Sequence, residues 1–170
     1  DFRYDEKNYA AYAGAAFKLS EKWDSKLGIR YEYTDAKGYS PQMAQENIIR
    51  YGRWFPSLYI SYKPSDSHAL NLNYSRRIDR PYFGSLNPFR TYSSEFEYYS
   101  GNPYLQPSFT DNLELGYIYK NNLTATLFAS HLSNGTDRIQ RIEDNMKFSM
   151  MENFYDENIY WKTTIIVDFH

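Results

Sequence analysis

The ionisable side chains of this chain favour binding over catalysis. Its histidines, His68, His131 and His170, lie far apart, and none has an Asp, Glu or Cys at a spacing typical of a metal site. The 21 Asp and Glu residues are so plentiful that neighbours such as Glu95 and Glu97 do not indicate an acid–base pair. The sequence has no nucleophile elbow, P-loop or dinucleotide-binding glycine motif. We therefore expect no enzyme, no cofactor and no metal site.

One passage, residues 74–107, carries groups suited to binding; it reads YSRRIDRPYFGSLNPFRTYSSEFEYYSGNPYLQP. Its arginine cluster, Arg76, Arg77 and Arg80, could clamp a carboxylate or phosphate, because guanidinium binds such groups at two points. The competing interpretation, which we favour, is that these arginines pair with acidic residues of neighbouring strands. Stacking on sugar rings or a planar chelate is open to the aromatic residues, although packing within the loop is the simpler role for most of them. The candidate ligand-binding residues are Arg77, Arg80, Tyr82, Phe89, Arg90, Tyr92, Tyr98 and Tyr104.

Composition points to a β protein. The 170 residues suffice for one domain with a substantial core, and 19% of them are aromatic, including 19 Tyr. The net charge of -2 gives no basic field for nucleic acid. The absence of cysteine excludes disulfides and thiolate metal sites, and no run of 18 apolar residues predicts a transmembrane helix.

Apolar and polar residues alternate with period two along most of the chain, as in Leu27, Ile29, Tyr31 and Tyr33. This alternation predicts strands with one apolar and one polar face, so the polar face should include Arg77, which follows Asn71, Asn73 and Ser75 in parity. We predict strands at about 7–20, 23–36, 51–63, 68–79, 110–120, 122–133 and 157–169, with ends uncertain by ~2–4 residues. Strands of this length exceed the usual ~5–6 residues and suit a tilted membrane crossing of ~9–11.

Short and long connections alternate strictly between these strands. The long ones are predicted at about 37–50, 80–109 and 134–156, and a small hairpin within 137–152 turns at residues 143–145. Outer-membrane barrels show this pattern, with short periplasmic turns and long external loops. Pro56 inside a predicted strand indicates an edge, a strand start or a bulge, and Trp23 beside the shortest turn is expected in an interfacial aromatic belt.

Three motifs in order give a family resemblance: residues 74–81 (YSRRIDRP), 86–89 (LNPF) and 101–107 (GNPYLQP). Together with residues 28–34 (GIRYEYT), Lys37-Gly38 and residues 4–12 (YDEKNYAAY), they closely resemble the barrel domains of TonB-dependent receptors of the kind abundant in Bacteroidetes. The resemblance covers roughly residues 1–142.

This resemblance implies an all-β, antiparallel up-and-down meander of about seven long strands that forms part of a large transmembrane barrel in the outer membrane. We read residues 1–170 as a single partial barrel segment, because seven strands are far fewer than the ~22 of outer-membrane transporters. The parent receptor would import a siderophore, glycan or peptide, with a plug domain, TonB and, as a further option, a surface lipoprotein as partners, and its outer face would meet outer-membrane lipid. No transport is expected from the fragment alone.

Two alternatives follow from the same residues. A soluble β-sandwich or small-barrel module that binds carbohydrate or protein would also suit Tyr-rich loops. An isolated fragment would leave unpaired backbone groups on its two outer strands, so we expect it to self-associate through these edges or to fold into a smaller sheet.

Overall fold

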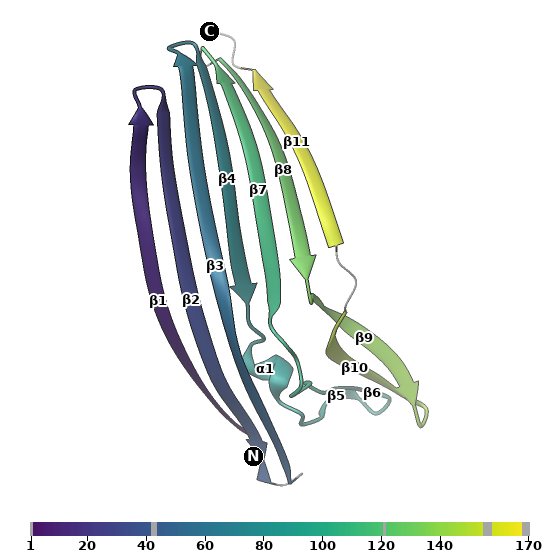
Figure 1. Ribbon diagram of the computed structural model, residues 1–170. Coiled ribbons are helices and arrows are strands. Elements are labelled where there is room, and N and C mark those ends of the chain that lie inside the picture. The colour runs from purple at the N-terminus through teal and green to yellow at the C-terminus, as the bar shows by residue number, and fades with distance from the viewer. Residues whose placement is uncertain (1, 42–43, 121, 155–157, 168–170) are drawn as a thin grey trace.

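One antiparallel sheet dominates the computed structural model, which describes residues 2–41, 44–120, 122–154 and 158–167 (Figure 1). Its order, β1-β2-β3-β4-β7-β8-β11, follows the chain, so the predicted up-and-down meander of seven strands is confirmed. Within the described residues β1 and β11 are the two edges, and the sheet is not closed. The strands are β1 (Arg3–Ser20), β2 (Trp23–Ser40), β3 (Gln45–Ser65), β4 (His68–Asp79), β7 (Ser108–Tyr119), β8 (Leu123–Ser133) and β11 (Asn158–Val167).

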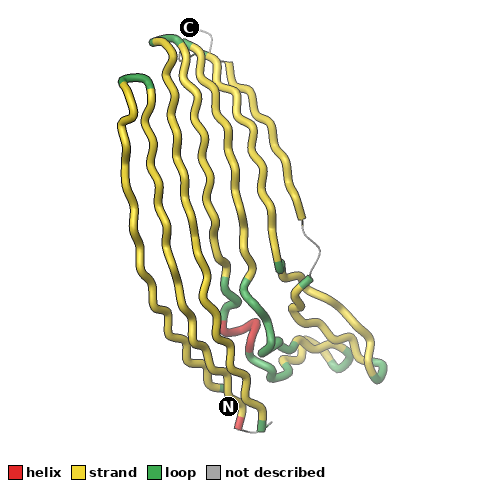
Figure 2. The backbone as a smooth tube through the Cα atoms, in the orientation of Figure 1, coloured by secondary structure: helices red, strands yellow, loops and turns green. Residues whose placement is uncertain are grey.

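A smaller sheet, here called the loop sheet, lies at the end of the molecule opposite the short turns (Figures 1 and 2). It has the order β5-β6-β10-β9 and is built from both long connections that follow β4 and β8. The predicted hairpin is confirmed, with a turn at Asp144 and Asn145, whose positive φ values of 50° and 62° suit a tight hairpin. The elements of the two connections are α1 (Phe83–Leu86), β5 (Thr91–Ser94), β6 (Glu97–Tyr99), β9 (Thr136–Glu143) and β10 (Met146–Asn153).

The predicted long loop at 37–50 is wrong. β2 continues to Ser40 and β3 already begins at Gln45, with an unbroken register between them. This extension has charged residues on its outer face, where Lys37 pairs with Glu46 at 3.1 Å and Arg50 with Asp35 at 3.2 Å. Water, unlike lipid, does not require an apolar face, so the alternation that reveals the strands elsewhere is absent here. The other strand ends agree within a few residues, and the predicted strand positions 157, 168 and 169, as well as residue 121 between two of the predicted strands, lie outside the described residues.

Pro56 lies in the middle of β3, opposite Ile29 of β2. The ladder between β3 and β4 begins only at Ser57, so residues 45–56 of β3 have no β4 partner. The proline therefore stands at a local edge, as predicted, where its missing N–H costs no ladder bond.

The odd-numbered face of β2 and its register partners form a continuous apolar surface. One row across the sheet runs Leu27, Leu58, Tyr74, Leu113 and Ala129. Several large apolar side chains on this face are 40–50% exposed, Leu27, Leu113 and Leu115 among them. Such a surface is stable when an apolar solvent covers it.

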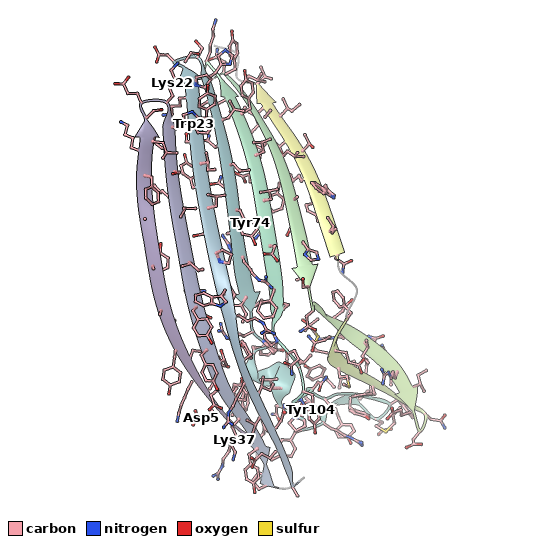
Figure 3. The ribbon with its side chains drawn as sticks, in the orientation of Figure 1. Asp5, Lys22, Trp23, Lys37, Tyr74 and Tyr104 are labelled. Carbon is pink, nitrogen blue, oxygen red and sulfur yellow. The ribbon has the colours of Figure 1, made fainter. Side chains whose placement is uncertain are left out.

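Aromatic pairs border this apolar surface on two levels. Near the short turns, Trp23 stacks on Tyr62 with ring centroids 4.1 Å apart, and toward the loops Tyr31 lies 4.7 Å from Trp54. Trp23 and Tyr31 are roughly eight residues apart on β2, or ~26 Å along the strand. Figure 3 shows Trp23 at one end of the sheet, Tyr74 between the ends, and Asp5 and Lys37 at the other end. Two aromatic girdles enclosing an apolar band are typical of outer-membrane barrels.

No helix in the described part of the chain combines the length and apolar character needed to cross a membrane.

Candidate functional site

The polar face of the sheet is covered at its loop end by residues 80–107, and Arg80 anchors them. Its guanidinium Nη2 lies 2.6 Å from Glu32 Oε2 and 3.4 Å from Thr34 Oγ1, and its Nε lies 3.5 Å from Glu6 Oε1. Glu32 is only 7% exposed and also pairs with Arg30 at 2.9 Å. Arg80 therefore joins the start of the loop to β1 and β2.

The guanidinium of Arg80 stays protonated, because its surroundings stabilise the charged form. Burial by itself lowers the pKa of Arg80, but the hydrogen bond to Glu32 and the further interactions with Tyr51 and Glu32 together outweigh burial, so the pKa is raised. The carboxylate of Glu6 is held in turn by the Tyr4 hydroxyl, which donates at 2.7 Å, and by the Asn8 amide at 2.6 Å. These contacts fit the structural interpretation of Arg80 as an ion-pairing residue at the end of the barrel wall.

Two leucines of the same loop pack on the wall beside this ion pair. Leu86 and Leu105 are each 2% exposed and line a small cavity together with Ala36 and Ile49. Burying two leucine side chains stabilises the loop by roughly 1.5–3 kcal/mol each. The loop is thus bound to β2 and β3 by apolar as well as charged contacts.

The two Asn-Pro motifs form matched turns within this loop. The Asn87 side chain accepts a hydrogen bond from the Phe89 N–H at 3.2 Å, and the Asn102 side chain accepts one from the Tyr104 N–H at 3.0 Å. Both are Asx turns, which asparagine favours because its side chain mimics a backbone turn. The motifs meet where Gly101 N–H donates to Asn87 O at 2.9 Å.

The second long loop is tied to the first by side-chain amides. Asn153 accepts from the Gln106 N–H at 2.8 Å and donates to Gln106 O at 3.0 Å. Asn134 donates to Pro107 O at 2.9 Å, and Asn102 donates to Met151 O at 3.2 Å. With the parallel pairing of β6 and β10, these bonds join the two loops into one unit.

Three predicted site residues, Arg90, Tyr92 and Tyr98, cluster within the loop sheet. Tyr98 is 5% exposed; its ring lies 5.0 Å from Phe148, 5.6 Å from Tyr92 and 4.7 Å from the guanidinium carbon of Arg90. The hydrogen bond that Arg90 donates to the Tyr92 hydroxyl is the main cause that raises the pKa of Arg90. Tyr98 therefore packs the loop, whereas Tyr92 and Arg90 remain exposed.

The remaining predicted aromatic residues are accessible to a ligand to different degrees. Tyr82 and Tyr104 are 69% and 55% exposed, whereas Phe89 is only partly exposed. Two phenylalanines that we did not single out, Phe83 and Phe96, are just as open. Their place in the same aromatic passage was the signal that could have included them.

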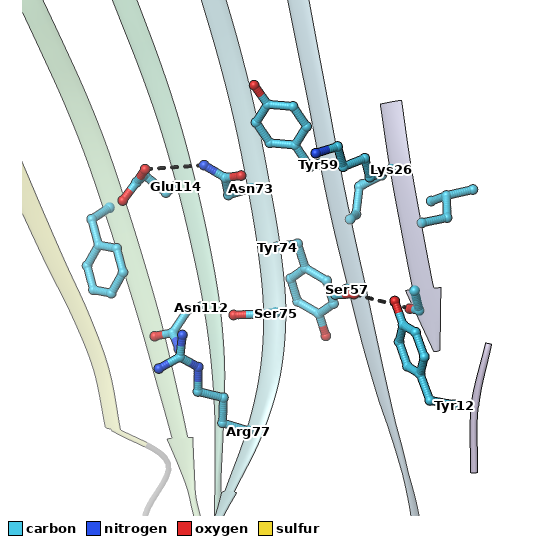
Figure 4. A pocket seen from close by; sticks show the side chains of 14 residues that line it. Tyr12, Lys26, Ser57, Tyr59, Asn73, Tyr74, Ser75, Arg77, Asn112 and Glu114 are labelled. Carbon is cyan, nitrogen blue, oxygen red and sulfur yellow. Dashed lines mark hydrogen bonds between the residues drawn. The ribbon is translucent and has the colours of Figure 1, made fainter. Parts of the chain in front are cut away.

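Beyond the loop, the polar face stays open and forms a hollow of about 710 Å³ (Figure 4). Asn73 donates to Glu114 across it at 3.3 Å, and Arg77 lies beside Asn112. The expected position of Arg77 on the polar face is therefore confirmed.

The three arginines of the cluster, Arg76, Arg77 and Arg80, do not converge. Arg76 is the register partner of Asp111 and lies 5.4 Å from the Phe109 ring, where it lines a separate hollow with Tyr51 and Arg53, whereas Arg77 lines the larger hollow. Arg80 is engaged by Glu32, which agrees with the favoured interpretation of an ion-pairing arginine and not with a single three-arginine clamp. Among the described residues, no group of three or more His, Asp or Glu side chains could hold a metal ion.

Comparisons with known proteins agree with this geometry. The profile of the outer membrane protein beta-barrel family matches residues 1–167. The hemophore receptor HasR of Serratia marcescens, solved with its hemophore HasA and heme, superposes with a TM-score of 0.72 at 11% identity, over 93% of this chain and 31% of that one. The copper transporter OprC superposes with a TM-score of 0.69 at 14% identity, over 97% of this chain and 27% of that one.

The siderophore receptor PirA of Pseudomonas aeruginosa gives a TM-score of 0.56 at 15% identity, over 95% of this chain and 39% of that one. The chain therefore spans about a third of the length of the solved proteins that it resembles. At these identities the likeness shows the fold.

Proposed function

Because this chain belongs to the outer membrane protein beta-barrel family, we propose that it forms part of the barrel wall of a TonB-dependent receptor that imports a scarce nutrient. The observation that carries the proposal is the opposed character of the two sheet faces. One face is an apolar band between aromatic girdles, and the other is polar and covered at one end by anchored loops. An outer-membrane location follows from the family, and the loop end is then the external end.

In this proposal the two joined loops contribute to ligand capture at the external end. Tyr82, Arg90, Tyr92 and Tyr104 are exposed there, and their rings and guanidinium suit sugar rings, planar chelates or peptides. The solved proteins of similar fold are receptors for siderophores or for a heme-carrying hemophore, and a copper transporter. For this chain a siderophore, glycan or peptide remains the proposed class. A plug domain, TonB and a surface lipoprotein, in a protein of the Bacteroidetes kind, are the proposed partners.

The experiment is deletion of the gene for the full-length parent in its native host, followed by growth on a panel of ferric siderophores, heme, oligosaccharides and peptides. A growth defect on one class, restored by the wild-type gene and not by a variant with Tyr82, Tyr92 and Tyr104 changed to alanine, would support uptake through these loops. Normal growth on every class, with the parent verified in the outer-membrane fraction, would contradict it.

The alternative of a soluble sandwich has less support. A sandwich needs a second sheet against the apolar face, whereas the second sheet of the described chain is the small loop sheet at one end. The apolar side chains of the large sheet remain exposed.

We propose that the free edges of β1 and β11 pair with neighbouring strands of the parent barrel. In an isolated fragment the same edges would pair with other copies. Size-exclusion chromatography with light scattering in the absence of detergent tests this; oligomers are expected, and a folded monomer would contradict it.

A further inference from the structure

The wall of the large sheet parts between β3 and β4 toward the loop end. The ladder between these strands ends at the pair of Ser57 with Ser75, and β3 continues past the end of β4 (Figure 1). A hollow of about 400 Å³ lies where the two strands part. Among the residues that line it are Tyr51 and Arg53 of β3, Arg76 of β4, Phe109 of β7, and Gln106 and Asn134 of the loops.

Two arginines of this hollow contact the same aromatic ring. The guanidinium carbons of Arg53 and Arg76 lie 5.5 Å and 5.4 Å from the centroid of the Phe109 ring. That ring is held in place, because Phe109 is only 8% exposed and lies 6.4 Å from the buried ring of Phe55. The ring attracts each cation, but it has no net charge and therefore leaves the repulsion between the two cations in place.

No carboxylate of the described residues balances these two charges. None of the residues that line the hollow is acidic. Asp111, the register partner of Arg76, instead accepts a hydrogen bond from the Tyr74 hydroxyl at 2.6 Å, and the buried Nε of Arg76 has no hydrogen-bond partner in the described part of the chain. Nearby arginines differ, since Arg30 and Arg50 have carboxylates at 2.9 Å and 3.2 Å. The hollow therefore carries two positive charges and an unused donor.

The rest of the lining suits an oxyanion that carries an organic group. The side-chain amides of Gln106 and Asn134 donate to Tyr104 O at 3.3 Å and to Pro107 O at 2.9 Å, and each amide has a second hydrogen to donate. Guanidinium binds phosphate oxygens at two points, and a phosphate monoester carries nearly two negative charges at pH 7. A carboxylate would neutralise only one of the two arginines. The hollow is far larger than one phosphate group, so an attached organic group has room beside Phe109.

We propose that this hollow is a binding site for a phosphate group, which Arg53 and Arg76 hold between them. The site goes beyond the proposed function, because none of the residues proposed for ligand capture lines it. Such a group has two sources at this place. One is a phosphorylated solute that enters from the loop end. The other is a lipid headgroup, because Arg53 adjoins Trp54 of the aromatic girdle, and girdles lie at the level of the headgroups.

The first arm of the test titrates inorganic phosphate into the full-length receptor in detergent and measures its affinity by calorimetry. The variant R53Q/R76Q should bind phosphate at least about tenfold more weakly, because it loses both charge-assisted contacts. The matched control R50Q/R141Q removes two arginines that pair with carboxylates outside the hollow, and it should keep the wild-type affinity. R53K/R76K keeps both charges but not the two-point fork, so its affinity should lie between the two.

The second arm adds phosphatidic acid or phosphatidylcholine to the same samples and counts the bound lipids by native mass spectrometry. Phosphatidic acid that stays on the wild type and the control but not on R53Q/R76Q would identify a lipid headgroup as the occupant. Binding of inorganic phosphate without retention of phosphatidic acid would identify a free phosphorylated solute. Either result supports the phosphate site.

Three results would overturn the proposal: a folded wild type that binds neither probe, R53Q/R76Q with wild-type affinity for both, or an equal loss of affinity in R50Q/R141Q. Heat-modifiable mobility in detergent gels reports separately whether each sample is folded. Arg53 is exposed, so R53Q alone keeps the test available if the change at Arg76 prevents folding. Folded R53Q with unchanged affinity for both probes would equally overturn the site.

Discussion

Arg80 and Arg50 both pair with a carboxylate of β2, but in different surroundings. The Glu32 side chain that holds Arg80 is 9% exposed, whereas the Asp35 side chain that holds Arg50 is 38% exposed. Breaking a buried pair costs ~3–5 kcal/mol, and Arg30, which stays beside Glu32, should keep the cost of R80Q near the lower end. An exposed pair is worth about 0–1 kcal/mol, so R50Q should change little. Urea unfolding of the refolded receptor measures both, and equal losses would contradict the anchor role of Arg80.

Gly101 offers a second residue-scale test, because a side chain there has no room. A Cβ atom would lie 2.5 Å from Asn87 O and 2.8 Å from Ser85 O, both backbone atoms that cannot rotate away. G101A should therefore separate the two Asn-Pro turns and cost ~1–3 kcal/mol. Gly116 is the matched control, since its Cβ would meet nothing closer than 4.0 Å. Limited proteolysis between residues 83 and 105 should accelerate in G101A and not in G116A; unchanged cleavage of G101A would count against the close approach.

At the scale of elements, the two long loops act as one unit because β6 pairs with β10. Phe148 of β10 packs on Tyr98 of β6, whereas Ile142 on β9 is 79% exposed. Because Phe148 is only partly buried, F148A should cost ~1–3 kcal/mol, and it should increase amide exchange in both β6 and β10 because the loops share this contact. I142A should leave exchange unchanged. Faster exchange in β10 alone would show that the loops move independently.

The sequence predicts the membrane-spanning strands well, because lipid on one side and a polar interior on the other enforce a strict period of two. It fails where that constraint ends. Residues 37–40 and 45–50 extend β2 and β3 into water. There, charged side chains such as Lys37 and Glu46 can occupy the outer face, so the alternation of apolar and polar residues is lost. The loop sheet was predicted only in part, because the hairpin turn at Asp144 is a local signal, whereas pairing of β6 with β10 joins segments roughly fifty residues apart.

Predictability of the candidate site follows the same physics. The face of Arg77 could be assigned by parity alone, and the structure confirms it. The acidic partner of Arg80 could be anticipated as a class, but its identity, Glu32, depends on how the loop folds back over β2. The burial of Tyr98 was not predictable, since it depends on Phe148 from the other loop. Ligand contact by the exposed aromatic residues stays a prediction.

On the scale of the whole molecule, the alternation of apolar and polar residues along each strand gives the sheet one apolar face and one polar face. On β1, β2 and β3, the charged residues Lys7, Asp35 and Arg50 of the apolar face lie on the loop side of the Tyr31–Trp54 girdle. Inside the girdles the apolar face carries mainly aliphatic and aromatic side chains, and most polar residues belong to the other face, where the hollows lie. The apolar face of this one sheet therefore sets its position in the membrane, and the polar face carries both the anchored loops and the open hollows.

This arrangement predicts that the folding free energy lost on adding a charge depends strongly on which face of the sheet receives it. Leu115, in the middle of β7 on the apolar face, is 44% exposed and has Leu72 and Leu127 as register partners. L115K should cost ~2–4 kcal/mol of folding free energy in a bilayer, because the ammonium would lie near the membrane midplane. Thr126 lies on the polar face opposite Gly116, so T126K should cost far less. Refolding of the full-length receptor into lipid vesicles, followed by the heat-modifiable fraction on gels, compares the two. Equal losses would mean that the apolar face does not meet lipid.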